Sequence, residues 1–463
     1  MAMTDADARK RLAIAVPSNV RLVCATLAAA GHQAVTVGGA VRDAILGRTP
    51  GDWDVATSAR PEDVMALFKR TIPTGLQHGT VTIVTGRGEE SHVEVTTYRG
   101  EGAYTDARRP DHVTFGVPLV EDLARRDLRV NAMAYDPESD QLIDPYAGRV
   151  DIDEKKLRAV GPTGDVYADA VARFTEDGLR VMRAVRFAAV LEFELDPETE
   201  RGIVPALPSL AKVSKERISD ELHKLLATRQ PSRALAIAER TGIIALILPK
   251  LAAGLDAWGE PRGGRAVAVS EWLARVDRAA YEADHAKLGV KERAAVVLAA
   301  LLVELGAPAF DPRRRDGLVF EHSDLLLRAL KFSNLEAHAA AHLASIARAA
   351  EVSDLTAPEV RKLFAAVGRE HATVAPVLWR ALAAAHSRVI AEAEQILRER
   401  HPLTAKELAV TGKDLIDALA QPPGPAIGRI LAILLTRVID DPRINTREQL
   451  LELAQQAELG GTL

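Results

Sequence analysis

Two aspartates separated by a single residue, Asp52 and Asp54, begin a segment with the composition of a β-strand. Side chains two positions apart in a strand point to the same side of a sheet, so both carboxylates can face one site while Trp53 packs the other way. Paired carboxylates suit divalent cations. Two such ions roughly 3.5–4 Å apart can activate an attacking hydroxyl and stabilise the leaving group in an in-line phosphoryl displacement. The spacing therefore predicts phosphoryl-transfer chemistry.

A glycine pair stands upstream of these aspartates. Ala34–Val37 is typical of a strand, Gly38-Gly39 of a tight turn, and Ala40–Leu46 of a short helix. Glycine lets a backbone approach a ligand closely, and the N–H groups at a helix N-terminus attract phosphate. Arg42, one turn into the helix, could donate to the same anion. An ordinary strand–helix turn has the same pattern, so the nearby aspartates are what favour a phosphate site.

A third carboxylate is available at Glu94. In the run His92–Tyr98, Val93 and Val95 alternate with Glu94 and Thr96, which is the pattern of a strand with one apolar and one polar face. If this strand neighbours the aspartates, Glu94 faces the same metal ions. The alternative is a solvent-exposed strand residue without a chemical role.

Short β-rich runs alternate with helices in the N-terminal third, as in an α/β domain. The other expected strands are Val81–Thr85 and His112–Phe115, and the expected helices there are Arg21–Ala30 and Pro61–Arg70. From about Asp151 onward, apolar residues recur at helical spacing, and no strand is expected after Arg158. The longest expected helices are Ala170–Val190, Ser214–Ala227, Lys291–Leu305 and Pro376–Arg400.

Composition excludes several classes of protein. The 463 residues carry 59 Lys+Arg against 64 Asp+Glu, for a net charge of −5, so a polyanion would have to bind local basic clusters. The single cysteine, Cys24, excludes intramolecular disulfides and cysteine-rich metal sites. The start of the chain, Met1–Arg11, has no apolar core of a secretion signal. The longest apolar run, Ala294–Val303, is about half a bilayer span. We expect a cytoplasmic protein without membrane segments.

The motifs described so far resemble a known superfamily. Gly38–Asp43, followed by Gly51–Thr57, is similar to the signature of the polymerase-β nucleotidyltransferases. More narrowly, it resembles the class II tRNA nucleotidyltransferase and bacterial poly(A) polymerase family. The resemblance implies an α+β, polymerase-β-like head with a mixed sheet, followed by an all-helical neck, body and tail. It also implies that Asp52 and Asp54 bind Mg²⁺, with Glu94 as a third catalytic carboxylate.

A basic motif lies further along the chain, where Arg125-Arg126-Asp127 is followed by Asn131. Alone it would be interpreted as a solvated run of charges, but it resembles the family's second motif in the expected order. Arg126 can bind a triphosphate. Asp127 and Asn131 can hydrogen-bond a ribose 2′-hydroxyl, which distinguishes ribonucleotides from deoxyribonucleotides.

The segment Arg173–Phe187 carries a pattern that could read a base. On one continuous helix, Asp177 and Arg180 are neighbours, and Glu176 lies one turn from Arg180. A carboxylate beside a guanidinium presents an acceptor and donors that complement cytosine and adenine. Uracil and guanine would leave polar groups unpaired, at about 1–3 kcal/mol each. A protein edge could thus select C and A without a nucleic-acid template, although a ladder of salt bridges has the same spacing.

The same segment continues with Arg183 and Arg186, which could reach the triphosphate from the same helical face. Its place in the family's order implies that Asp177, Arg180, Arg183 and Arg186 bind the nucleotide and that Glu176 orients Arg180. The family commonly has proline where this chain has Gly178, so we expect a looser helix start.

Two further segments resemble family motifs. Asp144–Asp151 is similar to a hinge between head and neck, although any linker could contain such residues. Lys212–Arg217, followed by Glu221, resembles the fifth motif. There Ser214 can cap a helix, while Lys215 and Arg217 could either fix the neck or contact RNA.

Within the family, Gln77–Thr82 resembles the form found in CCA-adding members rather than the Gly-Arg-Arg-Phe-type run of poly(A) polymerases. Arg99–Pro110 resembles a flexible loop implicated in the switch from C to A addition. A poly(A) polymerase and an A-adding enzyme remain enzyme alternatives. A catalytically idle RNA-binding protein is the non-enzyme alternative, which the intact pair Asp52 and Asp54 disfavours.

We therefore expect a catalytic head over 1–148, a base-reading neck over 149–226, a body over 227–340 and a tRNA-binding tail over 341–463. The expected reaction transfers CMP, CMP and then AMP from CTP and ATP to the 3′-hydroxyl of tRNA, and releases pyrophosphate. The expected cofactor is Mg²⁺. The sequence does not indicate an oligomeric state.

Overall fold

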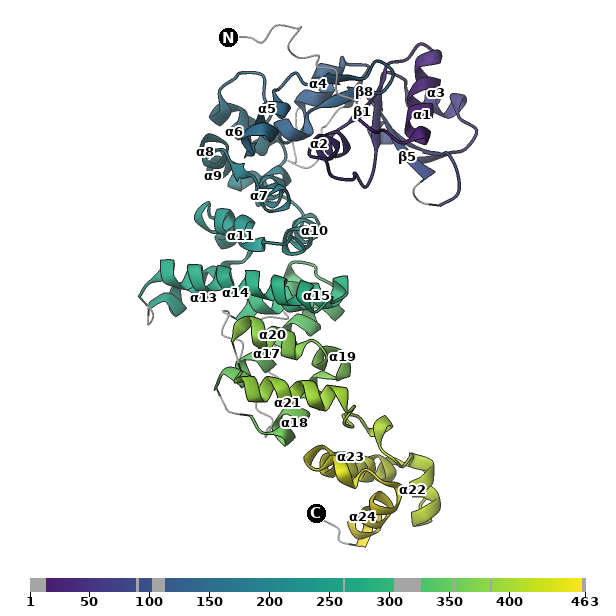
Figure 1. The fold of residues 1–463 in the computed structure, drawn as a ribbon, viewed down its shortest axis with the longest axis vertical. Coiled ribbons are helices and arrows are strands. Elements are labelled where there is room, and N and C mark those ends of the chain that lie inside the picture. The colour runs from purple at the N-terminus through teal and green to yellow at the C-terminus, as the bar shows by residue number, and fades with distance from the viewer. Residues whose placement is uncertain are drawn as a thin grey trace. The chain divides into compact units, whose positions relative to one another are not determined.

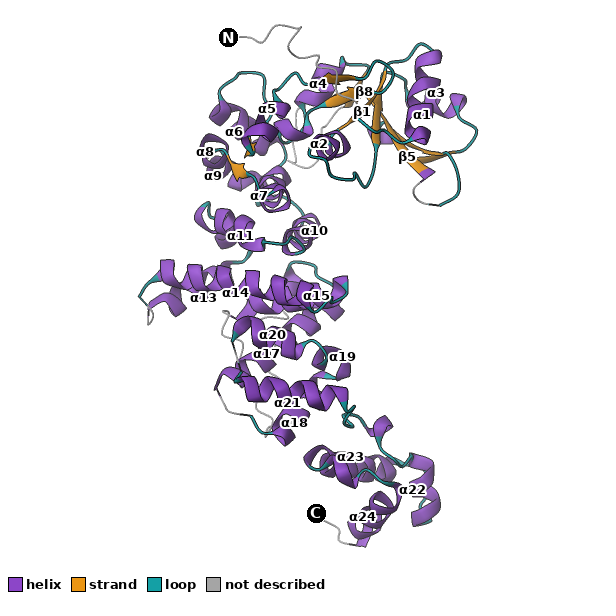
Figure 2. Cartoon of the chain, viewed as in Figure 1, coloured by secondary structure: helices purple, strands orange, loops and turns teal. Residues whose placement is uncertain are grey.

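The computed structural model describes residues 14–88, 91–101, 113–260, 263–303, 326–352, 355–383 and 385–459. The chain divides into two compact units, residues 1–225 with 233–247, and residues 226–232 with 248–463. The first unit contains sheet and helices, and the second is helical throughout its described part (Figures 1 and 2). The prediction of an α+β head followed by helices is confirmed.

A seven-stranded mixed sheet forms the centre of the first unit, in the order β3-β4-β5-β2-β1-β8-β9. Strands β2 and β5 run parallel, and the other neighbouring strands run antiparallel. The sheet consists of β1 (Ala34–Val37), β2 (Asp54–Thr57), β3 (Thr71–Gly75), β4 (Thr80–Val84), β5 (His92–Thr97), β8 (Ala134–Asp136) and β9 (Gln141–Ile143). The expected strands are present, whereas β3, β8 and β9 were not expected.

Helices and a short ribbon cover this sheet. Helices α1 (Ser18–Ala29) and α3 (Pro61–Leu67) pack against it and against each other (Figure 1). The ribbon joins β6 (Arg99–Glu101) to β7 (Val113–Phe115). An apolar cluster links Val35, Val37 and Ala56 of the sheet to Leu119 and Leu123 of α4 (Leu119–Ala124). Because Val37 is the register partner of Asp54, this cluster lies on the face of the sheet that carries that aspartate.

Short helices follow the sheet within the first unit. They are α5 (Gly148–Glu154), α6 (Val166–Glu176), α7 (Leu179–Leu191), α8 (Pro197–Arg201), α9 (Ile203–Leu210), α10 (Lys215–Leu226), α11 (Pro231–Arg240) and α12 (Ile243–Ile247). Two-residue strands β10 (Lys156–Leu157) and β11 (Glu194–Leu195) pair in parallel. The expectation of no strand after Arg158 is therefore wrong at β11, which is too short to leave a periodic signal.

The expected single helix Ala170–Val190 is also wrong. Helix α6 ends at Glu176, Asp177 is extended with φ −134° and ψ 106°, and α7 begins after Gly178. A Cβ atom at Gly178 would lie 2.3 Å from the backbone nitrogen of Leu210, so only glycine permits this close approach of α9. The break thus coincides with a close tertiary contact and not with a change in local periodicity.

The second unit contains α13 (Pro249–Gly259), α14 (Arg265–His285), α15 (Val290–Leu302), α17 (Asn334–Val352), α18 (Ala357–Val367), α19 (Arg369–Ala372), α20 (Ala375–Leu382), α21 (Ser387–Arg398), α22 (Gly412–Leu419), α23 (Pro425–Asp440) and α24 (Arg447–Leu459). The expected helix Pro376–Arg400 is instead α20 and α21, since Ala383 adopts the left-handed conformation with φ 50°. Within the described ranges, no helix is long and apolar enough to cross a membrane.

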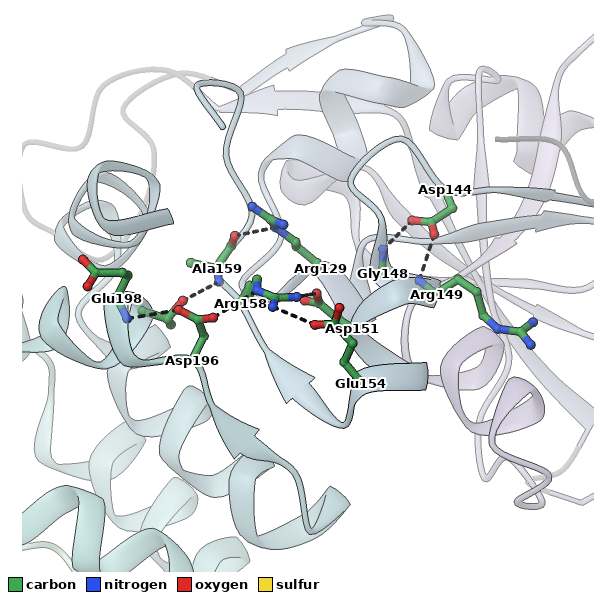
Figure 3. A network of polar contacts seen from close by, with 11 residues as sticks. Arg129, Asp144, Gly148, Arg149, Asp151, Glu154, Arg158, Ala159, Asp196 and Glu198 are labelled. Atoms are coloured by element: carbon green, nitrogen blue, oxygen red, sulfur yellow. Dashed lines mark hydrogen bonds and ion pairs between the residues drawn. The ribbon is translucent and has the colours of Figure 1, made fainter. Parts of the chain in front are cut away.

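A buried ionic network joins α5 to the helices that follow it (Figure 3). Arg158 donates to Asp151, to Glu154 at 2.7 Å and to Asp196 at 3.1 Å. The Asp151 side chain is 0% exposed, and burial raises its pKa to about 6 against the opposing charge of Arg158. Nearby, Asp144 accepts hydrogen bonds from the first backbone N–H groups of α5. The segment that resembled a hinge is thus held by several charged contacts.

We predict that Arg158→Ala lowers the free energy of unfolding by about 3 kcal/mol at pH 7, because it leaves the Asp151 carboxylate buried without its cation. The folded-state pKa of Asp151 lies above its unfolded value of 3.8, so protonation favours the folded state and the deficit should shrink between pH 7 and pH 5. Urea unfolding at several pH values measures both effects.

Arg149→Ala is the matched control. It removes an arginine of α5 that forms an exposed pair with Asp153 at 3.2 Å, and such pairs contribute about 0–1 kcal/mol. Equal losses for the two variants, or a deficit for Arg158→Ala that grows as the pH falls, would contradict the proposed burial of an unpaired charge.

Candidate active site

Three carboxylates lie on or next to the parallel strands β2 and β5. Asp54 is the first residue of β2, and its register partner across the parallel pairing is Glu94 of β5. Asp52 lies in the segment before β2, so the expectation that both aspartates belong to one strand is wrong for Asp52. The expected alternation in β5 is present, with Val93 and Val95 buried and Glu94 exposed. The sheet thus brings the predicted acidic residues together.

The environment of these carboxylates is negative. Asp54 is exposed at the surface, yet desolvation by the surrounding protein, followed by the charges of Glu94 and Asp52, raises its pKa to about 6 against the opposing charge of Arg126. In the described part of the chain, the carboxylates of Asp52, Asp54 and Glu94 have no hydrogen-bond or ion-pair partner. Acidic groups crowded in this way are stabilised by an added cation.

The donor set fits a hard divalent cation that keeps part of its water shell. Among the residues that the structure describes, no three His, Cys, Asp or Glu side chains converge enough to bind a metal alone. Mg²⁺ is commonly bound by one or two carboxylates, with water and substrate phosphates completing its six positions. Asp52 and Asp54 therefore suit a site that is completed by a phosphorylated ligand.

A glycine turn places an arginine beside these acids. Gly38 has φ 77°, and a Cβ atom there would lie 2.5 Å from Nη1 of Arg126. Arg126 also donates from Nη1 to the Asn131 carbonyl at 3.3 Å and lies 3.9 Å from Asp122. Burial lowers the pKa of Arg126 against the charge of Asp122. Gly38 is needed for its conformation and for the space that it leaves to this guanidinium.

A hydrogen-bonded chain connects helix α2 (Gly39–Ile45) to α7. Arg42 donates to Oδ1 of Asn131, and Nδ2 of Asn131 donates to Asp127 at 2.9 Å. The other oxygen of Asp127 accepts from Nε of Arg183 at 2.7 Å. Burial alone would raise the pKa of Asp127, but Arg183 and Asn131 lower it below the usual range. Predicted nucleotide-binding residues therefore hold one another in place.

The predicted base-reading residues also lie together. Asp177 accepts from the Leu179 N–H at 3.0 Å and from Nη2 of Arg217 at 2.9 Å, so it caps α7 rather than standing within a helix. Nη1 of Arg180 donates to Glu176 at 2.7 Å and to the Arg173 carbonyl at 3.2 Å. Both oxygens of Asp177 are thus fixed, and Glu176 orients the Arg180 guanidinium.

Several residues that the sequence did not single out as site residues complete these contacts. Asp43 pairs with Arg42 at 2.8 Å, and Glu221, noted only as part of a motif, pairs with Arg186 at 2.6 Å. Asp122 precedes Arg125 and Arg126 by one helical turn and pairs with both, so spacing alone could have indicated it. Of the predicted loop Arg99–Pro110, the residues after Glu101 lie outside the described ranges.

Three family models match parts of the chain. The poly A polymerase head domain matches residues 34–158. A model described as a probable RNA- and SrmB-binding site of polymerase A matches residues 192–255, and tRNA nucleotidyltransferase domain 2 matches residues 317–454. The first of these contains all three carboxylates and the Arg126 motif.

Similarity to curated proteins extends over nearly the whole sequence. The CCA-adding enzyme of Geobacillus stearothermophilus is 38% identical over 427 residues, which is 91% of this chain and 92% of that protein. The chain belongs to the CCA-adding enzyme family. Another member, from Lactococcus lactis subsp. cremoris, is 34% identical over 93% of this chain and 94% of its own length. The resemblance based on the motifs is confirmed.

A solved structure agrees with this membership. The crystal structure of the Bacillus stearothermophilus CCA-adding enzyme in complex with CTP is 31% identical, with a TM-score of 0.71 over 96% of this chain and 98% of that chain. This CCA-adding family member therefore shares both sequence and fold with a structure that contains a nucleotide.

We predict that Gly38→Ala weakens binding of a nucleoside triphosphate about tenfold, because the new methyl group displaces a charged hydrogen-bond donor, Arg126. Isothermal titration calorimetry measures the affinity. Gly47→Ala is the matched control, since Gly47 has a similar φ of 70° but no atom within 4 Å of the added Cβ. Equal weakening in both variants would show that backbone strain, and not the position of Arg126, causes the loss.

Proposed function

We propose that this protein adds the sequence CCA to the 3′ end of tRNA without a nucleic-acid template. The 3′-hydroxyl attacks the α-phosphate of CTP twice and then that of ATP, and each step releases pyrophosphate. Similarity over more than nine-tenths of the chain to proteins named CCA-adding enzymes, at 38% and 34% identity, is the observation that carries the proposal. The geometry around Asp54 and Asp177 supports it.

The acidic residues act on the phosphate. We assign Asp52 and Asp54 as the ligands of Mg²⁺, with Glu94 as the third catalytic carboxylate beside Asp54. Bound Mg²⁺ would lower the pKa of the attacking hydroxyl and neutralise charge on the triphosphate. The chain's own contribution is to hold three carboxylates near one another without hydrogen bonds or ion pairs to protein groups, with only the more distant charge of Arg126 acting on Asp54.

The junction between α6 and α7 selects the base. Asp177 offers an acceptor to the exocyclic amino group of cytosine or adenine, and Arg180 donates to the adjacent ring nitrogen. The contacts from Arg217 and Glu176 keep this pair in a fixed orientation. Uracil and guanine present the reverse order of donors and acceptors, so they leave buried polar groups unpaired.

The remaining predicted residues position the nucleotide. Gly38 and Gly39 allow the backbone to approach the phosphates, and the guanidinium groups of Arg42, Arg126, Arg183 and Arg186 neutralise them. Asp127 and Asn131 have a dual task, since they orient two of these arginines and can also accept or donate to the ribose 2′-hydroxyl. The network therefore connects recognition of sugar and phosphate.

We assign catalysis to residues 1–148, base reading to 149–226, and contact with the rest of the tRNA to the helical body, 227–340, and tail, 341–463. The match of a tRNA nucleotidyltransferase domain to residues 317–454 supports the last assignment. A cytoplasmic location is the one expected for an enzyme that acts on tRNA.

The direct test measures nucleotide incorporation by the full chain into tRNA that ends at its discriminator base. Each labelled nucleoside triphosphate is supplied alone, and CTP and ATP are also supplied together. We expect addition of two C residues from CTP alone and CCA from the mixture, with no use of UTP or GTP.

Asp177→Ala should lower the preference for CTP over UTP about tenfold or more, because the acceptor for the amino group is lost.

Asp165→Ala is the control, since Asp165 caps α6 by accepting from Ala168 N–H and offers nothing to the base. Incorporation of A alone would indicate an A-adding or polyadenylating enzyme. Absence of any incorporation would favour an RNA-binding protein without catalysis.

A second prediction concerns the metal. We expect Asp54→Ala to abolish nucleotide transfer at any Mg²⁺ concentration while tRNA binding stays within about twofold of the wild type, because the substitution removes a metal ligand but no contact with tRNA. Filter binding and transfer assays on the same preparation measure both. Glu62→Gln removes an exposed charge of the same domain and should leave both unchanged. Transfer by Asp54→Ala would refute the metal assignment.

A further inference from the structure

One aromatic ring lies at the centre of the arginine cluster. The guanidinium carbons of Arg42, Arg183 and Arg186 lie 5.1, 5.6 and 4.3 Å from the centroid of the Phe187 ring. All three distances are within the range of about 6 Å in which a cation is attracted to an aromatic face. Phe187 itself is 7% exposed. A single buried ring therefore contacts three cations.

The three arginines come from two separate helices. Arg183 and Arg186 belong to α7, as does Phe187, whereas Arg42 belongs to α2, next to the glycine turn. Arg183 precedes Phe187 by one helical turn, so the two side chains are neighbours on the helix surface. Arg42 reaches the ring from a separate part of the chain, since α2 lies far before α7 in the sequence. The ring thus joins the phosphate-binding turn to the base-reading helix.

Each arginine also has a carboxylate of its own. Arg42 pairs with Asp43 at 2.8 Å, Arg183 with Asp127 at 2.7 Å and Arg186 with Glu221 at 2.6 Å. These carboxylates fix the arginines one at a time, and each cancels part of the positive charge. By contrast, Phe187 contacts all three arginines at once. A neutral ring attracts cations without cancelling their charge.

We infer that Phe187 is a positioning residue for the incoming nucleotide: its ring gathers Arg42, Arg183 and Arg186 into one array that binds the triphosphate. The inference rests on the proposed function, in which a nucleoside triphosphate is the ligand. The ring resists the mutual repulsion of three cations, so that they remain close enough to bind adjacent phosphates. Because Phe187 does not touch the base-reading pair in this scheme, it contributes affinity and not selectivity.

The alternative is that Phe187 only fills the core of α7. The two roles predict different changes in ligand affinity when the ring is lost. Leucine fills much of the same space but has no aromatic face. If the ring only fills space, Phe187→Leu should alter all ligands alike or none. If it gathers the arginines, the loss should be confined to ligands that carry the β- and γ-phosphates.

The test compares Phe187→Leu, Phe187→Tyr and the wild type as full chains. Calorimetric titration with CTP and ATP, and competition by CMP, are measured without tRNA. We expect Phe187→Leu to bind CTP and ATP about tenfold more weakly and CMP within twofold of the wild type, and Phe187→Tyr, which keeps the ring, to restore most of the lost affinity. With tRNA, the KM for both nucleotides should rise while their ratio is unchanged.

Phe193→Leu is the matched control, because Phe193 is similarly buried at 4% exposure and follows the same helix. It should leave the affinity for CTP within twofold of the wild type. Phe187→Leu with unchanged CTP affinity, or with equal weakening of CMP and CTP, would overturn the inference. The binding measurements need no nucleotide transfer. A wild type that binds CTP but adds nothing to tRNA would therefore count against the proposed function alone.

Discussion

The arrangement of charge is the constraint on which the rest of this site depends. Parallel pairing of β2 with β5 sets Asp54 beside Glu94, and the segment before β2 adds Asp52. In the same unit, guanidinium groups lie around Phe187 and beside Gly38. Like charges that are packed together cost free energy unless something of opposite charge relieves them. In the proposed function, a nucleoside triphosphate with its metal ion would supply both: the cation would offset the charge of the acids, and the phosphates would add to the carboxylate partners that the arginines already have.

The arginines and the acids of the sheet have different charged partners, so the two clusters do not neutralise each other. The carboxylates that pair with the arginines, Asp43, Asp127 and Glu221, are not the carboxylates of the sheet. Arg126 is the exception, because its charge acts on Asp54. Separate partners allow each arginine to be held by a short hydrogen bond, while Asp52, Asp54 and Glu94 stay open. The first unit thus holds three arginines with one set of acids, while the proposed function assigns the other set to the metal.

Sequence reasoning could predict those parts of the structure that local pattern determines. The strand Ala34–Val37, the turn at Gly38 and the alternation around Glu94 follow from periodicity and glycine chemistry, and all are present. The break after Asp177 could not be predicted in this way, because apolar spacing continues across it. At the break, the backbone of Ser209 and Leu210 lies so close to Gly178 that a Cβ atom there would clash, and this contact is distant in sequence. Phe187 was missed for a related reason, since an aromatic residue on the apolar face of a helix is usually interpreted as core.

The break also fixes Asp177, the residue that the proposed function assigns to reading the base. Within a continuous helix, the backbone N–H of Leu179 would bond to a carbonyl one turn earlier. At the start of a new helix it is free, and Asp177 accepts from it. Together with the bond from Arg217, this fixes the carboxylate from two directions and leaves its remaining lone pairs for a ligand. A template must present its acceptor in one orientation, because a mobile carboxylate could rotate to suit the wrong base. Ending α6 at Glu176 therefore gives Asp177 the rigidity that the proposed selection between bases would require.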